Sequence, residues 1–291
     1  MKKNTKGGAG IRTTLLTLVV LFALVVLGAA GGAAFVYFGV YNVAATDNHT
    51  APVYWLLDIA MRRSVKQRAE GIEVPALDDQ ALIERGFRLY RGECEQCHGG
   101  PGVAPEAIAL GMTPLPANLV HTAREWQPAE LFWVVKHGIK MAGMPAWEFR
   151  LPEKDLWAIV AFVRQLPTMA PLEYKAAAMK LKEVPAEAVS SPPGPLIESG
   201  KPERGKAAIQ QYACATCHKI PGIVGANAPV GPTLEGIAAR QFIAGVLPNT
   251  HENMVRWLMA PLEVDPRSAM PDLRVTARDA NDIAAYLDTL E

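Results

Sequence analysis

The chain has 291 residues, of which 50% are apolar and 20% are charged. This composition excludes a wholly disordered chain, which requires low hydrophobicity and a high net charge. Lysine plus arginine equals aspartate plus glutamate, 29 against 29, so no excess of positive charge favours nucleic-acid binding. The 4 cysteines are too few for a dense disulfide scaffold.

The N-terminal segment has the pattern of a single membrane-spanning helix. Basic residues up to Arg12 precede an uncharged stretch at 13–46 that is rich in Leu, Val and Ala, and about 20 apolar residues are enough to cross the hydrocarbon core. The basic residues predict that the N-terminus stays in the cytoplasm and that the rest is exported. A cleaved signal peptide is the alternative, since Gly28, Ala29 and Ala30 resemble a cleavage site, but the apolar run exceeds the roughly 7–15 residues of a signal peptide.

The rest of the chain is organised around two similar units. Each unit begins with a short helical pattern around a glycine, carries a Cys-x-x-Cys-His motif, and ends in an amphipathic helix, over 153–163 or 276–290. No alternating strand pattern of useful length is present, so we predict an all-α fold. The predicted segments are a cytoplasmic tip and anchor at 1–46, a spacer at 47–78, a first domain at 79–167, a linker at 168–200 and a second domain at 201–291.

Short helices are also expected in the two connecting segments. Residues 61–68 of the spacer and 173–183 of the linker have helical patterns. The proline-rich stretch at 190–195 indicates a semi-stiff connection between the two domains.

Two pentapeptides carry the chemistry of the chain, Cys94-Glu95-Gln96-Cys97-His98 and Cys214-Ala215-Thr216-Cys217-His218. This spacing is the signature of covalent c-type haem attachment. Two thiols three positions apart on a helical turn can each form a thioether with one haem vinyl group, and the adjacent histidine supplies the proximal iron ligand. We therefore predict two covalently attached haem c groups, bound through Cys94, Cys97, Cys214 and Cys217, with His98 and His218 on the irons.

Other uses of the cysteines fit the pattern less well. A four-cysteine zinc site expects its second pair about 15–20 residues after the first, whereas Cys214 follows Cys97 by more than a hundred positions. A thioredoxin-like redox pair requires a βαβ context, which is absent from the pattern. Two disulfides are possible in an exported chain, but they do not explain a histidine after both pairs.

The sixth iron ligand is expected on a loop downstream of each motif. Residues 141–145 offer two methionines, Met141 and Met144, and residues 268–271 offer Met270. A proline follows Met144 and Met270, and it stiffens the loop that carries the ligand. We therefore predict Met144 and Met270, with Met141 as the alternative for the first haem. Thioether ligation favours ferrous iron and raises the reduction potential.

The remaining histidines and methionines are given structural roles. His137 ends a helical pattern just before Gly138, a favourable C-terminal position for a histidine. His49, His121 and His251 are expected on the surface or in loops. Core packing is the expected role of Met112, Met169, Met179, Met254 and Met259.

Over residues 80–290 the chain resembles class I cytochromes c twice. The first domain is similar to the domain of membrane-bound dehydrogenase and oxidase cytochromes, through residues 94–102 and 130–146. The second domain is similar to the cytochrome domain fused to subunit II of some haem–copper oxidases, through residues 240–250 and 252–258. The copper-binding portion of that subunit is absent, so its activity is not carried over.

The resemblance also implies a fold. In the cytochrome c fold an N-terminal helix crosses a C-terminal helix, and the haem edge is exposed to partners. Gly86 would then allow a close crossing against Ala161, and Gly205 would allow one against 284–285.

The function expected from these features is electron transfer rather than enzymatic catalysis. The protein would be a single-pass cytochrome of the bacterial cytoplasmic (inner) membrane, with both haem domains on the periplasmic side. It would relay single electrons from a quinol-oxidising complex or a periplasmic dehydrogenase to a terminal oxidase. One alternative is a dihaem enzyme of the peroxidase or thiosulfate-oxidising type, which needs an iron with an open position. The other is a haem subunit of a larger respiratory complex.

Overall fold

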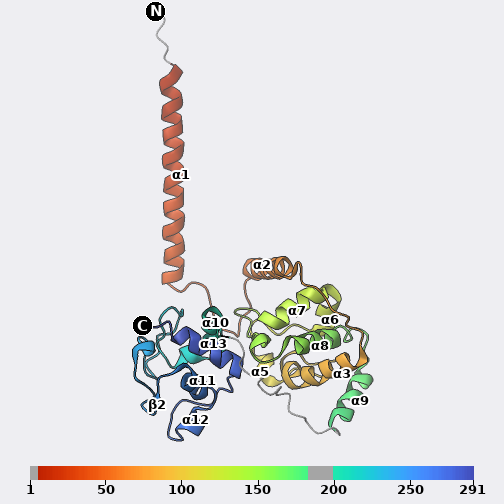
Figure 1. Ribbon diagram of the computed structural model, residues 1–291. Coiled ribbons are helices and arrows are strands. Elements are labelled where there is room, and N and C mark those ends of the chain that lie inside the picture. Colours follow the sequence, from red (N-terminus) through yellow and green to blue (C-terminus); the bar gives the residue numbers. More distant parts are fainter. Residues whose placement is uncertain (1–5, 183–198) are drawn as a thin grey trace, which may run out of the picture. The chain divides into compact units, whose positions relative to one another are not determined.

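The computed structural model describes residues 6–182 and 199–291, and the chain divides into one compact unit up to Ala51 and a second from Pro52 onward (Figure 1). The first unit holds α1 (Lys6–Tyr37). Its stretch Arg12–Tyr37 has a mean hydropathy of 2.5 and none of it is buried within the protein. By length and composition this one helix could cross a membrane, which is consistent with the predicted anchor.

The second unit consists of helices and loops with one small hairpin. In chain order the helices are α2 (Ala51–Ala69), α3 (Gln80–Leu89), η1 (Tyr90–Cys94), α4 (Glu95–His98), α5 (Ala107–Leu110), α6 (Leu119–Glu125), α7 (Pro128–His137), η2 (Trp147–Phe149), α8 (Glu153–Val163), α9 (Pro171–Lys182), α10 (Pro202–Gln211), η3 (Cys214–Thr216), η4 (Ile237–Ala239), α11 (His251–Met259), α12 (Pro261–Val264) and α13 (Ala277–Leu287). The antiparallel strands β1 (Phe242–Ile243) and β2 (Leu247–Pro248) pair Phe242 with Pro248 and Ile243 with Leu247. The all-α prediction is confirmed, because the strands found within the described residues are these two, each only two residues long.

A pair of crossing helices forms the frame of each domain. A Cβ atom on Gly86 of α3 would lie 1.9 Å from the carbonyl oxygen of Ala158 in α8, so the two backbones touch at this point. Gly205 of α10 makes the same approach to α13, where a Cβ atom would lie 1.9 Å from the carbonyl oxygen of Asp282. The predicted close crossings at both glycines are therefore confirmed.

The contacted residues lie two or three positions before those predicted, Ala161 and 284–285. In an α-helix the carbonyl of each residue points toward the amide four residues later. The oxygen of Ala158 therefore lies at the level of Ala161, and that of Asp282 at the level of Ala285. The glycine meets the expected stretch of the helix, but it meets backbone oxygen rather than a small side chain.

Two hydrophobic cores are built on these crossings. The first contains the rings of Phe132 and Trp157, stacked with centroids 3.9 Å apart. Its fully buried side chains include Tyr90, Leu156, Ile159, Phe162 and Tyr174. The second core includes Ile209, Tyr212, Trp257, Ile283 and Leu287.

The predicted spacer is more structured than its sequence pattern indicates. The helix predicted over 61–68 extends over the whole of α2, and its Val65 and Ala69 are buried. Arg62 of α2 lies 3.2 Å from Glu125 Oε2 and 5.8 Å from the centre of the Trp126 ring. The end of this segment therefore packs against the first domain.

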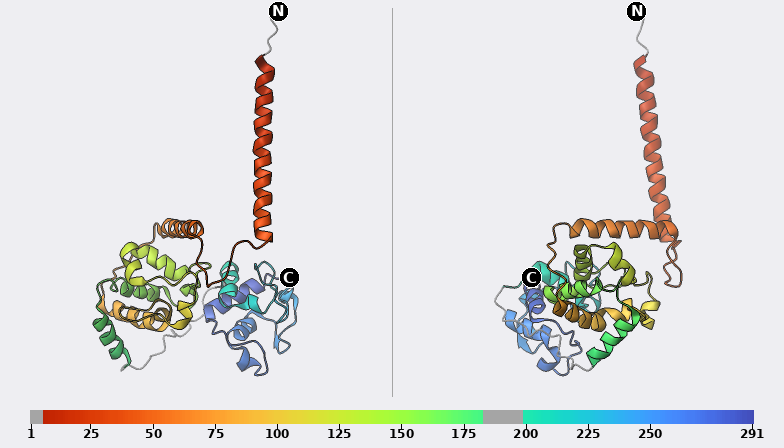
Figure 2. Two further views of the ribbon diagram at one scale, coloured as in Figure 1. Left: turned by 180° about the vertical axis from the view of Figure 1, so that it is seen from behind. Right: turned by 90° about the vertical axis from the view of Figure 1, so that its right-hand side faces the viewer.

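The first part of the predicted linker packs on the first domain as well. Helix α9 lies beside α3 (Figures 1 and 2), with the rings of Tyr174 and Phe87 5.3 Å apart. The helix predicted over 173–183 is thus observed as α9, whereas the proline-rich stretch lies outside the described residues. The exact limits of the five predicted segments stay a prediction.

Candidate functional site

The first motif lies on a continuous helical path. Helix α3 passes through the single π-turn η1 into α4, which carries Cys97 and His98. Gly99 ends α4 with φ of 63°, a conformation that glycine adopts without strain, and its amide donates to the carbonyl of Glu95 at 2.8 Å. The two thiols of the motif are therefore one helical turn apart.

The second motif forms a tighter turn. Ala213 enters the 3₁₀ turn η3 with φ of 56°, which residues other than glycine rarely adopt. The amide of His218 then donates to the carbonyl of Cys214 at 3.0 Å. This hydrogen bond closes the turn of the second motif. The π-turn that precedes the motif in the first domain, η1, has no counterpart here.

Both motif histidines are held by the same kind of contact. The Nδ1 atom of His98 lies 2.8 Å from the carbonyl oxygen of Ala117, and that of His218 lies 2.8 Å from the carbonyl oxygen of Pro232. A carbonyl can only accept, so Nδ1 carries the ring proton and Nε2 keeps its lone pair. This is the tautomer and the outer hydrogen bond of a histidine that ligates a metal.

Burial favours the neutral form of the first of these rings. Desolvation lowers the pKa of His98, although its contact with Ala117 acts in the opposite direction. A neutral imidazole is the form that can donate its lone pair to iron.

Gly231 forms a flat support for the second histidine. A Cβ atom at this position would lie 2.5 Å from Cε1 of His218, so the ring rests directly on the Gly231 backbone. The amide of Gly231 also donates to the carbonyl of Cys217 at 2.7 Å. One short segment therefore holds both the backbone of the motif and the plane of its histidine, which fits a ring fixed beneath haem iron.

Within the described residues no disulfide joins any of the four cysteines. Burial raises the pKa of Cys94 to about 12 and that of Cys214 to about 11. In the described part of the chain no group of three or more His, Cys, Asp or Glu side chains could hold a metal ion.

The two methionines of the first domain lie in different environments. Met144 is half-buried, and its carbonyl accepts from the amide of Ile139 at 3.3 Å. Met141 is 91% exposed and occupies the left-handed region with φ of 61°. Met112 lies against the same loop, since a Cβ atom on Gly143 would be 2.1 Å from its Cε. The half-buried Met144 is the better placed of the two candidates.

Met270 of the second domain is also half-buried. It packs against the second core, and its amide donates to Oγ of Ser268 at 3.1 Å. The assignment of Met144 and Met270 as the sixth ligands stays a prediction.

The remaining histidines form side-chain contacts away from the motifs. His137 is the last residue of α7 and precedes Gly138, whose φ is 64°, so the predicted helix-end position is confirmed. Its Nδ1 lies 3.2 Å from Glu148 Oε1. His49 contacts Tyr41, His121 contacts Glu125, and His251 contacts Asp288.

Several residues that shape the motifs were not found from the sequence. The carbonyl groups of Ala117 and Pro232 belong to the backbone, so no side chain marks them in the sequence. The one pattern that they share is that each residue precedes a polar residue and a leucine, at 118–119 and 233–234. Tyr174, in the predicted linker, donates its hydroxyl to Glu95 Oε1 at 2.7 Å. Glu95 stands between the two cysteines of the first motif, so α9 holds this motif in place.

Both domains match known protein families. Residues 81–163 match the family described as cytochrome c oxidase, cbb3-type, subunit III, and residues 202–291 match the family described as cytochrome c. A stretch of 89 residues is 27% identical to cytochrome c oxidase subunit 2 of Alkalihalophilus pseudofirmus (strain ATCC BAA-2126 / JCM 17055 / OF4). This match covers 30% of the chain and 25% of that relative, so the chain spans about a quarter of its length.

Proposed function

Because the chain belongs to the cytochrome c family through two tandem domains, at 81–163 and 202–291, we propose that it is a membrane-anchored dihaem cytochrome that relays single electrons. Cytochrome c domains imply electron transfer. The observation that carries the proposal is that His98 and His218 make the same hydrogen bond. The Nδ1 atom of each lies 2.8 Å from a backbone carbonyl oxygen. One such contact could occur at any buried histidine. Here it occurs at the histidine of the Cys-x-x-Cys-His motif in each of the two domains.

At each site the cysteines, the histidine and the backbone carbonyl would have separate roles in binding haem. A haem bound there supplies one-electron redox chemistry at an iron whose potential depends on its axial ligands and burial. Cys94 and Cys97, and likewise Cys214 and Cys217, would tether the porphyrin. The carbonyls that accept from Nδ1 fix the histidine rings, so that reorientation of this ligand is not needed when the iron changes its oxidation state.

The comparisons support redox partners of the respiratory type. One domain matches a family described as an oxidase subunit, and the relative is named as one. We therefore propose a terminal oxidase as the electron acceptor and a quinol-oxidising complex or a periplasmic dehydrogenase as the donor. The basic residues up to Arg12, which precede the apolar stretch of α1, support an anchor that leaves both domains on the periplasmic side.

A second candidate is a haem subunit of a larger respiratory complex. The description of the first matching family as subunit III of an oxidase favours it. Purification from membranes in mild detergent distinguishes the two. A free relay elutes alone, whereas a subunit elutes with partners in fixed stoichiometry. A dihaem enzyme is less well supported, because each domain offers a half-buried methionine that would close the open position on iron.

The methionine ligand of the first haem can be tested with a matched pair of variants. Met144→Ala is expected to convert one low-spin haem to a high-spin form and to lower its reduction potential, because the thioether stabilises ferrous iron. Met141→Ala removes the same side chain from the same loop, and its 91% exposure predicts an unchanged spectrum and potential. Visible absorption and redox titration measure both. A spectral change in Met141→Ala alone would reverse the assignment.

A further inference from the structure

A short segment of the first domain is built into the second. Residues 146–150 begin directly after Met144 and Pro145, on the loop that carries the proposed methionine ligand. Within this segment Ala146 and Phe149 are each 5% exposed and belong to the hydrophobic core of the second domain. Burial of a phenylalanine side chain removes a large apolar surface from water and so stabilises the contact that buries it. The two domains therefore share apolar packing at this point.

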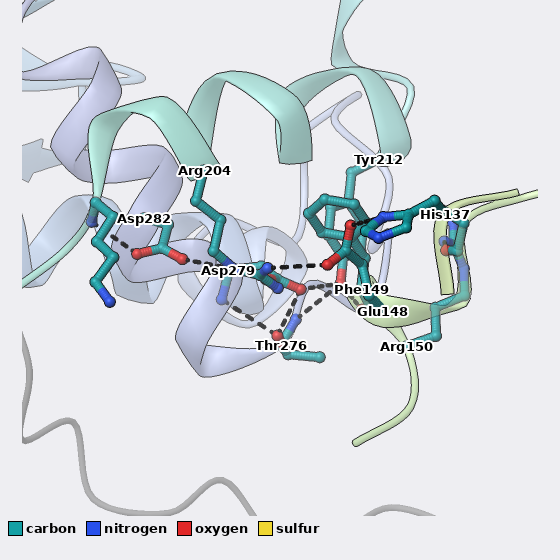
Figure 3. Close-up of polar contacts among 11 residues, drawn as sticks. His137, Glu148, Phe149, Arg150, Arg204, Tyr212, Thr276, Asp279 and Asp282 are labelled. Carbon is teal, nitrogen blue, oxygen red and sulfur yellow. Dashed lines mark hydrogen bonds and ion pairs between the residues drawn. The ribbon is translucent and has the colours of Figure 1, made fainter. Parts of the chain in front are cut away.

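Tyr212 is the centre of the polar contacts at this junction (Figure 3). Its hydroxyl lies 2.8 Å from the carbonyl oxygen of Phe149 and 2.9 Å from Oδ2 of Asp279. Both of these atoms accept, so the single hydroxyl proton is shared between a carbonyl of the first domain and a carboxylate of the second. Burial, followed by the charge of Asp279, raises the pKa of Tyr212 to about 12.

Arg150 adds a second connection to the same turn. Its Nη2 donates to the carbonyl of Gln211 at 3.0 Å, and its guanidinium lies 5.7 Å from the centre of the Tyr212 ring. Such a cation over an aromatic face is attractive. Tyr212 is thus held from the first domain at both its ring and its hydroxyl.

Arg204 connects the charged groups around the junction. Its guanidinium lies 3.6 Å from Glu148 of the first domain, 3.1 Å from Asp279 and 3.1 Å from Asp282. The two aspartates are 1% and 4% exposed, and a buried carboxylate without a counter-charge is strongly destabilising. Glu148 is also bound by His137, and this contact is the main cause of its lowered pKa. Arg204 therefore joins an acidic residue of one domain to two of the other.

The junction connects the two proposed haem sites along the chain. Phe149 follows Met144 by five positions, and Tyr212 precedes Cys214 by two. We propose that Tyr212 is a positioning residue for electron exchange between the two haems, and that its hydrogen bond to Phe149 is part of the route. With haem bound at both motifs, one electron would pass from one site to the other, and no bond would form or break and no proton would move. The inference rests on the proposed function, because it requires both haems.

The route follows from how electronic coupling falls with distance. Coupling decays less steeply through covalent and hydrogen bonds than through gaps between atoms. The path Met144 to Phe149, across the 2.8 Å hydrogen bond to Tyr212, and on to Cys214 contains one non-covalent step. Loss of the hydroxyl replaces that step by a van der Waals gap.

Tyr212→Phe tests this role against a matched control. We expect the variant to slow inter-haem electron exchange severalfold, measured by rapid photoreduction and time-resolved absorption of the full chain in detergent, while both reduction potentials stay unchanged. The control Tyr286→Phe removes a hydroxyl that donates to the carbonyl of Pro221 at 2.7 Å within the second domain. It is expected to leave the exchange rate as in the wild type. Equal rates in all three proteins, or equal slowing in both variants, would overturn the proposal.

Two further measurements separate this inference from the function on which it rests. Haem content is determined first, so a chain without haem rejects the proposed function before any rate is measured. The junction itself is tested by Arg204→Gln and hydrogen exchange of the full haem-loaded chain, a measurement that does not depend on electron exchange. Because the domains share a core, we expect faster exchange in peptides of both 79–167 and 201–291. A change confined to the second domain would contradict the fixed junction.

Discussion

Gly86→Ala is expected to destabilise the first domain by at least about 3 kcal/mol, the upper range for overpacking of a core. The new Cβ atom would lie 1.9 Å from the carbonyl oxygen of Ala158, 2.5 Å from its carbonyl carbon and 2.9 Å from Cβ of Phe162. A helix backbone cannot turn aside as a flexible side chain can, so α3 and α8 must move apart. Since a domain has only about 5–15 kcal/mol of total stability, a loss of this size removes roughly a fifth to three fifths of it. Thermal unfolding measures the change.

Gly92→Ala is the matched control for this prediction. Gly92 belongs to the same domain, is exposed, and has no atom within 4 Å of the position of a Cβ. We expect its stability to stay within about 0.5 kcal/mol of the wild type. A similar loss in both variants, or none in Gly86→Ala, would show that the crossing of α3 and α8 is less close than described.

The double variant Cys214→Ser/Cys217→Ser is expected to lose one of the two covalent haems and to keep the other. Serine has nearly the same shape but cannot form a thioether, and the first motif is untouched. Denaturing electrophoresis with haem staining and the mass of the purified chain measure the result. Thr216→Ser, at the position between the two cysteines, keeps both thiols and is expected to retain both haems. Full haem content in the double variant would reject the second attachment site.

The parts of the fold that the sequence predicted are those governed by local pattern. The helix predicted over 153–163 has the same bounds as α8, because Pro152 precedes its first residue and an apolar run continues from Leu156 to Val163. The helix predicted over 276–290 is α13 (Ala277–Leu287), which ends within the last turn of the prediction. The close approaches at Gly86 and Gly205 were instead implied by the resemblance to class I cytochromes c, in whose fold an N-terminal helix crosses a C-terminal one.

Contacts between distant segments could not be read from the sequence in this way. Helix α2 begins ten residues earlier than predicted, because only its charged second half has a clear helical pattern. The contact of Phe149 with Tyr212 joins positions 63 residues apart, and the acceptor is a backbone carbonyl. Tyr174 was assigned to a linker because proline-rich composition surrounds it, whereas its hydroxyl is held by Glu95. The candidate ligands could thus be predicted, but not the groups that orient them.

The most direct test of a dihaem cytochrome is the intact mass of the mature protein, isolated after export under conditions that support c-type cytochrome maturation and measured after denaturation. We predict the mass of the polypeptide plus two haem groups, which remain attached because thioether bonds survive unfolding. The mass of the bare polypeptide would contradict covalent attachment at Cys94, Cys97, Cys214 and Cys217, and with it the proposed relay of electrons.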